Sequence, residues 1–178
     1  ARGAGDTDHA SSIMGHVFSL LLSMSLFLMT FCLSFRRPVM FLFGASESSY
    51  VYADAYLRIY LLGTPFAMLS TGMNHFINAQ GFPRIGMLTT VIGALLNLVL
   101  DPLFIYVFDW GIQGAAIATI TAQVLALIWQ FKLFSNKNEL LHFHKGIFRL
   151  KKKIVFDSLA IGMAPFLMNL AACFIVIL

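Results

Sequence analysis

Long apolar runs separated by short polar stretches dominate the hydropathy pattern of this chain. A helix needs about 20 apolar residues to cross a hydrocarbon core of about 30 Å. Five stretches reach that length and predict five membrane-spanning helices: Ser11 to Phe35, about Ala55 to Gln80, Ile85 to Phe108, Trp110 to Phe131, and Ile154 to Leu178. The composition agrees, because charged residues make up only 11% of the chain, against about 25% in a soluble domain. The pattern therefore predicts an all-α membrane protein.

The connections between these runs differ in character. The stretch from Arg36 to Asp54 mixes Pro, Gly and Ser with apolar residues, which is typical of a short re-entrant or interfacial connection. The sequence GFPR forms a predicted turn in which Pro83 can start the next helix. The connection from Asp109 to Gly111 is so short that the third and fourth helices are predicted to form an antiparallel hairpin.

The basic residues gather in one loop. Seven of the twelve Lys and Arg residues lie between Lys132 and Lys153, and such loops are usually cytoplasmic. Counting helices backward then places Arg84 inside, and Arg36 and Arg37 outside. No aromatic side chains alternate with basic ones to form a nucleic-acid-binding face, so anionic lipid is the expected partner of this charge rather than nucleic acid.

Asp101 is a lone carboxylate within the third apolar run. A charge at the centre of a spanning helix costs about 2.5–3.5 kcal/mol on insertion scales, so it is a functional-site hypothesis by default. Asn97 lies four residues earlier and shares a helical face with Asp101. In the next helix, Gly114 and Ala118 form a small-residue stripe that permits close packing, so Thr119 is expected to face the carboxylate. Alternatively, these polar groups only tie two helices together.

Three prolines lie inside the predicted spans, namely Pro65, Pro102 and Pro165. Each frees a backbone carbonyl and bends the helix axis, and neighbouring groups must then satisfy the freed carbonyl. We therefore expect helix kinks at these positions. The pair His142 and His144 has no Cys or carboxylate ligand at a matching spacing, so no transition-metal site is predicted there.

Several segments carry a resemblance to a known family. GALLNLVLDPLFIYVF, followed by WGIQGAAIATITAQ, resembles the fifth-to-sixth-helix signature of the multidrug and toxic compound extrusion (MATE) transporters. Upstream, YLRIYLLGTPFAMLSTGMNHFINAQGFPRIGM resembles the fourth helix of that family, and IGMAPFLMNLAA is similar to the start of its seventh helix. The resemblance implies that the chain covers the third to seventh helices of a twelve-helix, two-lobe transporter.

The domain organisation follows from this resemblance. Residues 1–134 would be four helices of the amino-terminal lobe, residues 135–153 a cytoplasmic linker between the lobes, and residues 154–178 the first helix of the carboxy-terminal lobe. The chain begins with Ala1 rather than Met and ends inside an apolar run. We therefore expect it to be a piece of a longer protein, whose remaining helices are its partners together with the lipid bilayer.

The resemblance also implies an activity. Proton or sodium entry would drive export of drugs and other small organic compounds across the cytoplasmic membrane, without a cofactor and without enzymatic chemistry. The coupling-ion residues of the family fall on Asp101, Asn97, Thr119 and Tyr56, with no metal expected beyond a sodium ion at Asp101. The further acid that the family takes from its first helix has no counterpart in this chain. Asn78 stands where the family often has Arg, which puts the role of that cation in doubt.

Two rival functions are weighed against export. A flippase for lipid-linked saccharides, from a related superfamily, is the alternative, but it is expected to line its cavity with Arg and Lys, and the apolar spans carry almost none. A membrane enzyme would need grouped nucleophilic or metal-binding side chains. The Ser, His and carboxylate residues of this sequence are not grouped in that way.

Overall fold

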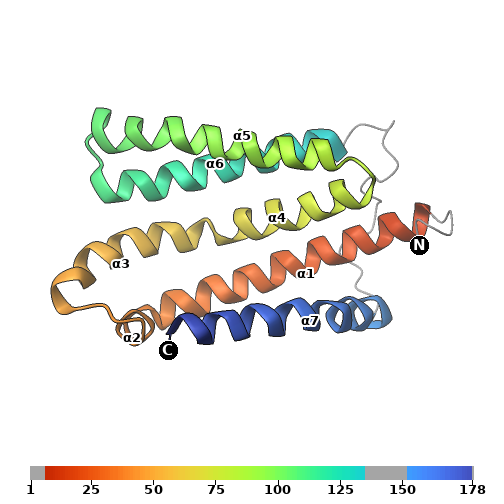
Figure 1. The fold of residues 1–178 in the computed structure, drawn as a ribbon, viewed down its shortest axis with the longest axis horizontal. Coiled ribbons are helices and arrows are strands. Elements are labelled where there is room, and N and C mark those ends of the chain that lie inside the picture. Colours follow the sequence, from red (N-terminus) through yellow and green to blue (C-terminus); the bar gives the residue numbers. More distant parts are fainter. Residues whose placement is uncertain (1–6, 135–151, 178) are drawn as a thin grey trace. The chain divides into compact units, whose positions relative to one another are not determined.

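The computed structural model describes residues 7–134 and 152–177 of the chain, which form helices joined by short turns (Figure 1). The helices are α1 (Thr7–Ser34), α2 (Arg36–Leu42), α3 (Glu47–Leu62), α4 (Thr64–Ala79), α5 (Pro83–Pro102), the π-helix η2 (Leu103–Val107), α6 (Gly111–Phe134) and α7 (Lys152–Ile177). The chain divides into two compact units, one of residues 1–20 and 143–178 and the other of residues 21–142. All candidate coupling residues lie in the second unit. His142, His144 and most of the predicted linker 135–153 lie outside the described residues.

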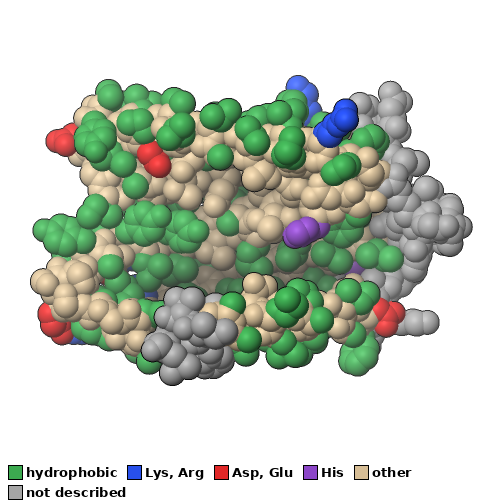
Figure 2. All heavy atoms as spheres, viewed as in Figure 1, with side chains coloured by type: hydrophobic (Ala, Val, Ile, Leu, Met, Phe, Trp, Pro, Cys, Tyr) green, Lys and Arg blue, Asp and Glu red, His purple; other side chains and the backbone are tan. Residues whose placement is uncertain are grey.

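Four of the helical segments are long and apolar enough to cross a membrane, namely Ser11–Ser34, Pro83–Val107, Gly111–Phe134 and Val155–Ala172. They correspond to four of the five predicted spans. The exposed side of α5 is covered mainly by hydrophobic side chains (Figure 2), which include Met87, Leu88, Val91, Leu95, Leu98 and Val99. Exposed apolar side chains along a whole helix are what a lipid environment requires. The chain is therefore a multi-pass membrane protein.

The remaining predicted span, from about Ala55 to Gln80, is built from two helices rather than one. The structure corrects its beginning, because α3 already starts at Glu47 inside the stretch predicted as a connection. The physical reason is a capping box. The Ser49 backbone N–H donates to Ser46 Oγ at 3.2 Å, and the Ser46 N–H donates to Ser49 Oγ at 3.0 Å. These bonds satisfy backbone donors that a helix start leaves free.

The break between α3 and α4 falls at Gly63. Pro65 lies in the first turn of α4, where its missing N–H costs no helical hydrogen bond. A side chain at Gly63 would collide with Ile120 of α6, so glycine permits the close approach of this junction to α6. Further along, the buried Gln130 of α6 donates from Nε2 to the Ser70 carbonyl of α4 at 3.0 Å. The broken segment is thus held against α6 on both sides of the break.

Candidate functional site: a polar cluster in the α5–α6 hairpin

The helices α5 and α6 pack side by side as an antiparallel hairpin (Figure 1). Glycine residues lie at points of close contact between the two arms. A Cβ atom at Gly114 of α6 would lie 2.6 Å from the Phe104 carbonyl oxygen, which is closer than side chains tolerate. A Cβ atom at Gly93 of α5 would lie 3.8 Å from the Ala126 Cβ atom. Backbones this close bring short polar side chains of the two helices within hydrogen-bond distance.

Asn97 bonds to two other polar residues of this hairpin. Its Nδ2 atom donates to Asp101 Oδ1 at 3.1 Å and to Thr119 Oγ1 at 3.3 Å. The Thr119 hydroxyl donates in turn to the Ala115 carbonyl at 3.0 Å, so it receives the Asn97 bond on a lone pair. All three side chains are partly buried. The structure therefore brings together three of the four predicted coupling residues, which we call the Asn97 cluster.

Asp101 has spare bonding capacity in this arrangement. Over residues 7–134 and 152–177, the structure records no ion pair to Asp101 and no protein donor to its Oδ2 atom. The Asn97 Oδ1 atom likewise receives no donor from these residues. The bonds of Asn97 thus bring a carboxylate group, a carboxamide group and a hydroxyl group together, and hard cations prefer oxygen ligands of these types.

Pro102 lies directly beside Asp101, where the helix changes type. Its ring carries no N–H and clashes with the carbonyl four residues earlier, so the α-helical pattern cannot continue unchanged. The chain continues as the π-helix η2, in which the Phe108 N–H donates to the Leu103 carbonyl at 3.0 Å. Short π-helical turns occur frequently at functional sites. Asp101 thus occupies the last α-helical turn before a change in helix geometry.

A cavity of about 530 Å³ adjoins the Asn97 cluster. Helices α4, α5 and α6 supply its lining, which includes both Asn97 and Thr119. The polar lining residues are Ser70, Thr71, Asn74, His75, Asn78, Thr89, Thr90, Asn97, Thr119 and Gln123. No Lys, Arg, Asp or Glu side chain from the described residues lines it. The cavity therefore offers many hydrogen-bonding groups without a fixed charge, and two members of the Asn97 cluster connect it to the Asp101 carboxylate.

The α4 side of this cavity is organised by an asparagine pair. Asn74 donates from Nδ2 to the Gly86 carbonyl at 3.0 Å and to Thr90 Oγ1 at 3.1 Å, while its Oδ1 atom accepts from Asn78 Nδ2 at 3.2 Å. From the sequence, Asn74 and His75 could either face the cavity or bond to a neighbouring helix, and packing was the favoured interpretation; both residues line the cavity. The available signal was the four-residue spacing of Asn74 and Asn78 on an apolar helix. Asn78, the position where the family often has Arg, therefore bonds within this network.

Tyr56 lies apart from the other predicted coupling residues. It stacks on Tyr60, with ring centroids 5.6 Å apart, and lines a separate pocket with Met40 and Ile112. It is not among the residues that line the cavity beside the Asn97 cluster. Of the predicted kinks, Pro65 begins α4, Pro102 ends α5, and Pro165 lies inside α7.

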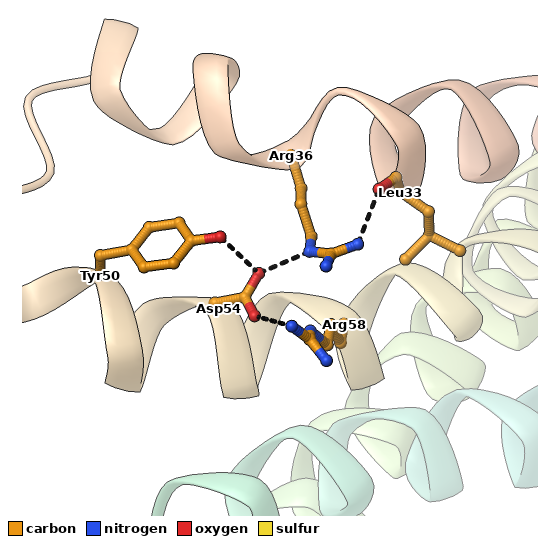
Figure 3. Close-up of polar contacts among 5 residues, drawn as sticks. All are labelled: Leu33, Arg36, Tyr50, Asp54 and Arg58. Carbon is orange, nitrogen blue, oxygen red and sulfur yellow. Dashed lines mark hydrogen bonds and ion pairs between the residues drawn. The ribbon is translucent and has the colours of Figure 1, made fainter.

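A second polar cluster, not predicted from the sequence, joins α2 to α3 (Figure 3). Arg36 Nε lies 2.7 Å from Asp54 Oδ1, and Arg58 Nη2 lies 2.6 Å from Asp54 Oδ2. Tyr50 also donates to Asp54 Oδ1 at 3.4 Å. Burial acts to raise the pKa of Asp54, but the hydrogen bonds and charges of Arg58 and Arg36 outweigh it and lower that pKa. The four-residue spacing of Asp54 and Arg58 was visible in the sequence.

Comparison with known proteins identifies relatives that share this helical arrangement. The family profile MatE matches residues 1–103, which is more than half of the chain. The multidrug export protein MepA of Staphylococcus aureus (strain bovine RF122 / ET3-1) is 26% identical over 172 residues, covering 96% of this chain and 38% of its own length. The same-named protein of Staphylococcus saprophyticus is 28% identical over 151 residues, with 85% and 33% covered.

Solved structures of MATE proteins are also similar to this chain. A MATE protein in the straight conformation superposes with a TM-score of 0.84 at 28% identity, covering 94% of this chain and 38% of that one. An inward-facing multidrug resistance MATE family transporter of the MOP superfamily gives 0.83 at 27% identity, covering 90% and 37%. The chain therefore spans about 38% of the length of the relatives that it matches most fully.

Proposed function

Because the chain belongs to the MatE family, we propose that it is part of a transporter that exports drugs and other organic, often cationic, compounds in exchange for protons or sodium ions. Members of this family are transporters rather than enzymes. The MepA relatives are named as multidrug export proteins. Within such a transporter, the Asn97 cluster would hold the coupling ion, and the adjacent cavity would form part of the substrate path.

The observation that carries this proposal is the double role of Asn97 and Thr119. Both residues line the cavity, and Asn97 bonds to both Asp101 and Thr119. A change in the charge of Asp101 therefore alters hydrogen bonds at the cavity wall. Ion and substrate binding linked in this way share one coupling free energy, so each changes the affinity for the other by the same factor.

The chemistry of the cluster suits either coupling ion. Protonated Asp101 would keep a hydrogen bond with Asn97 while losing its charge. A sodium ion would instead contact the carboxylate and the Thr119 hydroxyl oxygen, and a half-turn of the Asn97 carboxamide would present Oδ1 in place of Nδ2. Either event removes an uncompensated charge from an apolar helix. We propose that this change alters the bend at Pro102 and shifts access to the cavity.

Export by the reconstituted full-length transporter tests the proposal. Liposomes preloaded with a fluorescent organic cation would be energised by a proton or a sodium gradient, and efflux would be measured for the wild type and for Asp101→Asn. We expect the variant to insert normally and to lose gradient-driven efflux. Undiminished efflux by Asp101→Asn would overturn the proposal.

The matched control is Asp109→Asn, which makes the same chemical change in the exposed turn of the same hairpin. Asp109 has a positive φ of 56°, a conformation that asparagine also tolerates. This variant is expected to export normally. Repeating the wild-type measurement in sodium-free buffer separates the two coupling ions, because a sodium-coupled transporter stops there and a proton-coupled one does not.

A further inference from the structure

Asp54, Arg36 and Arg58, which we call the Asp54 cluster, carry more positive than negative charge. The carboxylate of Asp54 is shared by Arg36 and Arg58, so this group of three residues has a net positive charge. The neighbouring Arg37 lies over the rings of Phe41 and Tyr50, at 6.0 Å and 5.7 Å from their centroids. No carboxylate from the described residues pairs with Arg37. This surface therefore has an excess of cationic groups.

Arg58 has donors left for a further partner. Its side chain is 56% exposed, although one nitrogen is bonded to Asp54. A guanidinium group has five N–H donors and no acceptor, and its planar fork matches phosphate oxygens. The Asp54 side chain is only 8% exposed, and both of its oxygens already accept bonds. An anion that approaches this surface therefore meets the guanidinium rather than the carboxylate.

A pocket of about 430 Å³ lies beside this guanidinium and is lined by Val51, Asp54, Ala55, Arg58, Ile59 and Gln113. We call it the Arg58 pocket. Gln113 is exposed and lies in the first turn of α6, where the backbone N–H groups have no helical partner and the helix dipole is positive. The pocket lining thus combines the half-exposed Arg58 guanidinium, the Gln113 carboxamide and the Asp54 carboxylate, whose two oxygens already accept bonds. Gln113 also places the first turn of α6 beside the pocket.

The surroundings of the pocket are apolar and exposed. Val51 and Tyr52 on α3 are 66% and 64% exposed, and Ile112 at the start of α6 is 46% exposed. Aromatic and aliphatic side chains next to Arg at the ends of membrane helices are typical of the level where lipid headgroups meet the acyl chains.

We propose that the Arg58 pocket binds the phosphodiester of an anionic phospholipid, with the acyl chains along Val51 and Ile59. The phosphate accepts hydrogen bonds from Arg58 and Gln113, and the positive end of α6 favours the negative charge. Because the Asp54 carboxylate is shared between Arg36 and Arg58, it does not fully compensate Arg58, and this favours an anionic lipid over a zwitterionic one. The inference depends on membrane embedding alone and goes beyond the proposed transport activity.

Thermal stabilisation by added lipid tests this site. The purified protein in a neutral detergent would be titrated with dioctanoyl phosphatidylglycerol, dioctanoyl phosphatidylcholine, or inorganic phosphate. Phosphatidylglycerol is expected to raise Tm in a saturable way, and the other two compounds are not. In Arg58→Gln and in Gln113→Leu, the apparent affinity for phosphatidylglycerol should fall by about tenfold or more, because each loses charge-assisted or polar contacts to the phosphate.

Two variants separate loss of the lipid site from damage to α3 and from a general loss of positive charge. Gln113→Leu leaves both Asp54 ion pairs in place, so its effect does not come from damage to α3. Arg37→Gln removes the same charge outside the pocket and should retain the wild-type response. Equal stabilisation of the wild type and Arg58→Gln would overturn the inference, and so would an equal loss in Arg37→Gln. Equal stabilisation by inorganic phosphate would overturn the assignment to a lipid.

Discussion

Asp54 and Asp101 are carboxylates in the same unit of the chain, but their partners differ. Asp54 is buried and holds two guanidinium groups within 2.7 Å and 2.6 Å. Asp101 is partly buried and accepts a hydrogen bond from the neutral Asn97 at 3.1 Å. Fixed cations compensate the charge of Asp54 permanently. Among the described residues, no fixed cation compensates the charge of Asp101.

This difference separates a structural carboxylate from one that can exchange its partner. A buried carboxylate with two permanent ion pairs has little to gain from a proton or a sodium ion. A carboxylate with a neutral partner, beside a cavity, gains a neutralising charge when it binds a mobile cation. The ion pairs of Asp54 hold α2 against α3, whereas the neutral surroundings of Asp101 support the proposed ion coupling.

We expect the largest loss of export when Asp101 is given a fixed cation, as Asp54 has. Asn97→Lys places an ammonium group four residues before Asp101, where the two can pair as Arg58 and Asp54 do. We expect gradient-driven export to fall by more than about 100-fold, because replacing even a supporting group of an ion site costs about 10–100-fold. Efflux of an organic cation from liposomes is the measurement. Asn97→Gln keeps a carboxamide and adds no charge, so it is the comparison and should lose less export than Asn97→Lys. Full activity of Asn97→Lys would contradict the assignment.

Removing the charge of Asp54 should affect stability rather than coupling. Asp54→Asn leaves Arg36 and Arg58 without a counter-charge, and hydrogen bonds to charged groups contribute about 1.5–3 kcal/mol. Because both arginines are partly exposed, we expect the free energy of unfolding to fall by about 1–2 kcal/mol. Denaturant titration in detergent measures this change. Asp101→Asn serves as the comparison and should not lose stability; a larger loss there than in Asp54→Asn would reverse the two roles.

Thr119 should contribute to ion affinity through its oxygen. Thr119→Val keeps the shape but removes the acceptor of the 3.3 Å bond from Asn97. We expect the cation concentration for half-maximal export to rise by about tenfold. Thr121→Val is the matched control, since the Thr121 hydroxyl donates to the Ile117 carbonyl of its own helix. Equal shifts in the two variants would show that the Thr119 oxygen has no special role.

Acid should weaken the Asp54 cluster by a smaller amount. The pKa of Asp54 lies below the ordinary value of 3.8. The stabilisation is therefore fully present above that value and is lost as the pH falls through the lower folded-state pKa. Tm should accordingly decrease below about pH 3.8 in the wild type and decrease less in Asp54→Asn. A scan of Tm against pH from 6 to 3 measures the difference, and parallel curves would count against the ion pairs as its cause.

Much of the helical framework was predictable, because apolar runs of spanning length can be recognised one segment at a time. The start of α3 was not, since Ser46 and Ser49 were read as loop residues although their spacing permits a capping box. The grouping of Asn97, Asp101 and Thr119 followed from helical spacing and one short turn. By contrast, the ion pair between Arg36 and Asp54 connects residues on different helices. The helical spacing of residues within one segment cannot predict such a contact.

The coupling role that the resemblance implies for Tyr56 stays a prediction. Its position in the sequence matched the family pattern, but its ring stacks on Tyr60 beside Met40 and Ile112 rather than at the Asn97 cluster. The cavity lining differs from the favoured interpretation of the sequence. Packing was the favoured interpretation of Asn74, yet its carboxamide bonds to that of Asn78 and both residues line the cavity wall.

The most direct measurement is cation binding to the purified full-length transporter. Sodium binding is measured with an isotope, and proton binding is measured as proton release on substrate addition. We expect the wild type and Asp54→Asn to bind the coupling ion, and Asp101→Asn to bind neither ion. Unchanged ion binding in Asp101→Asn, or its loss in Asp54→Asn with the protein still folded, would contradict the assignment of the mobile cation to Asp101.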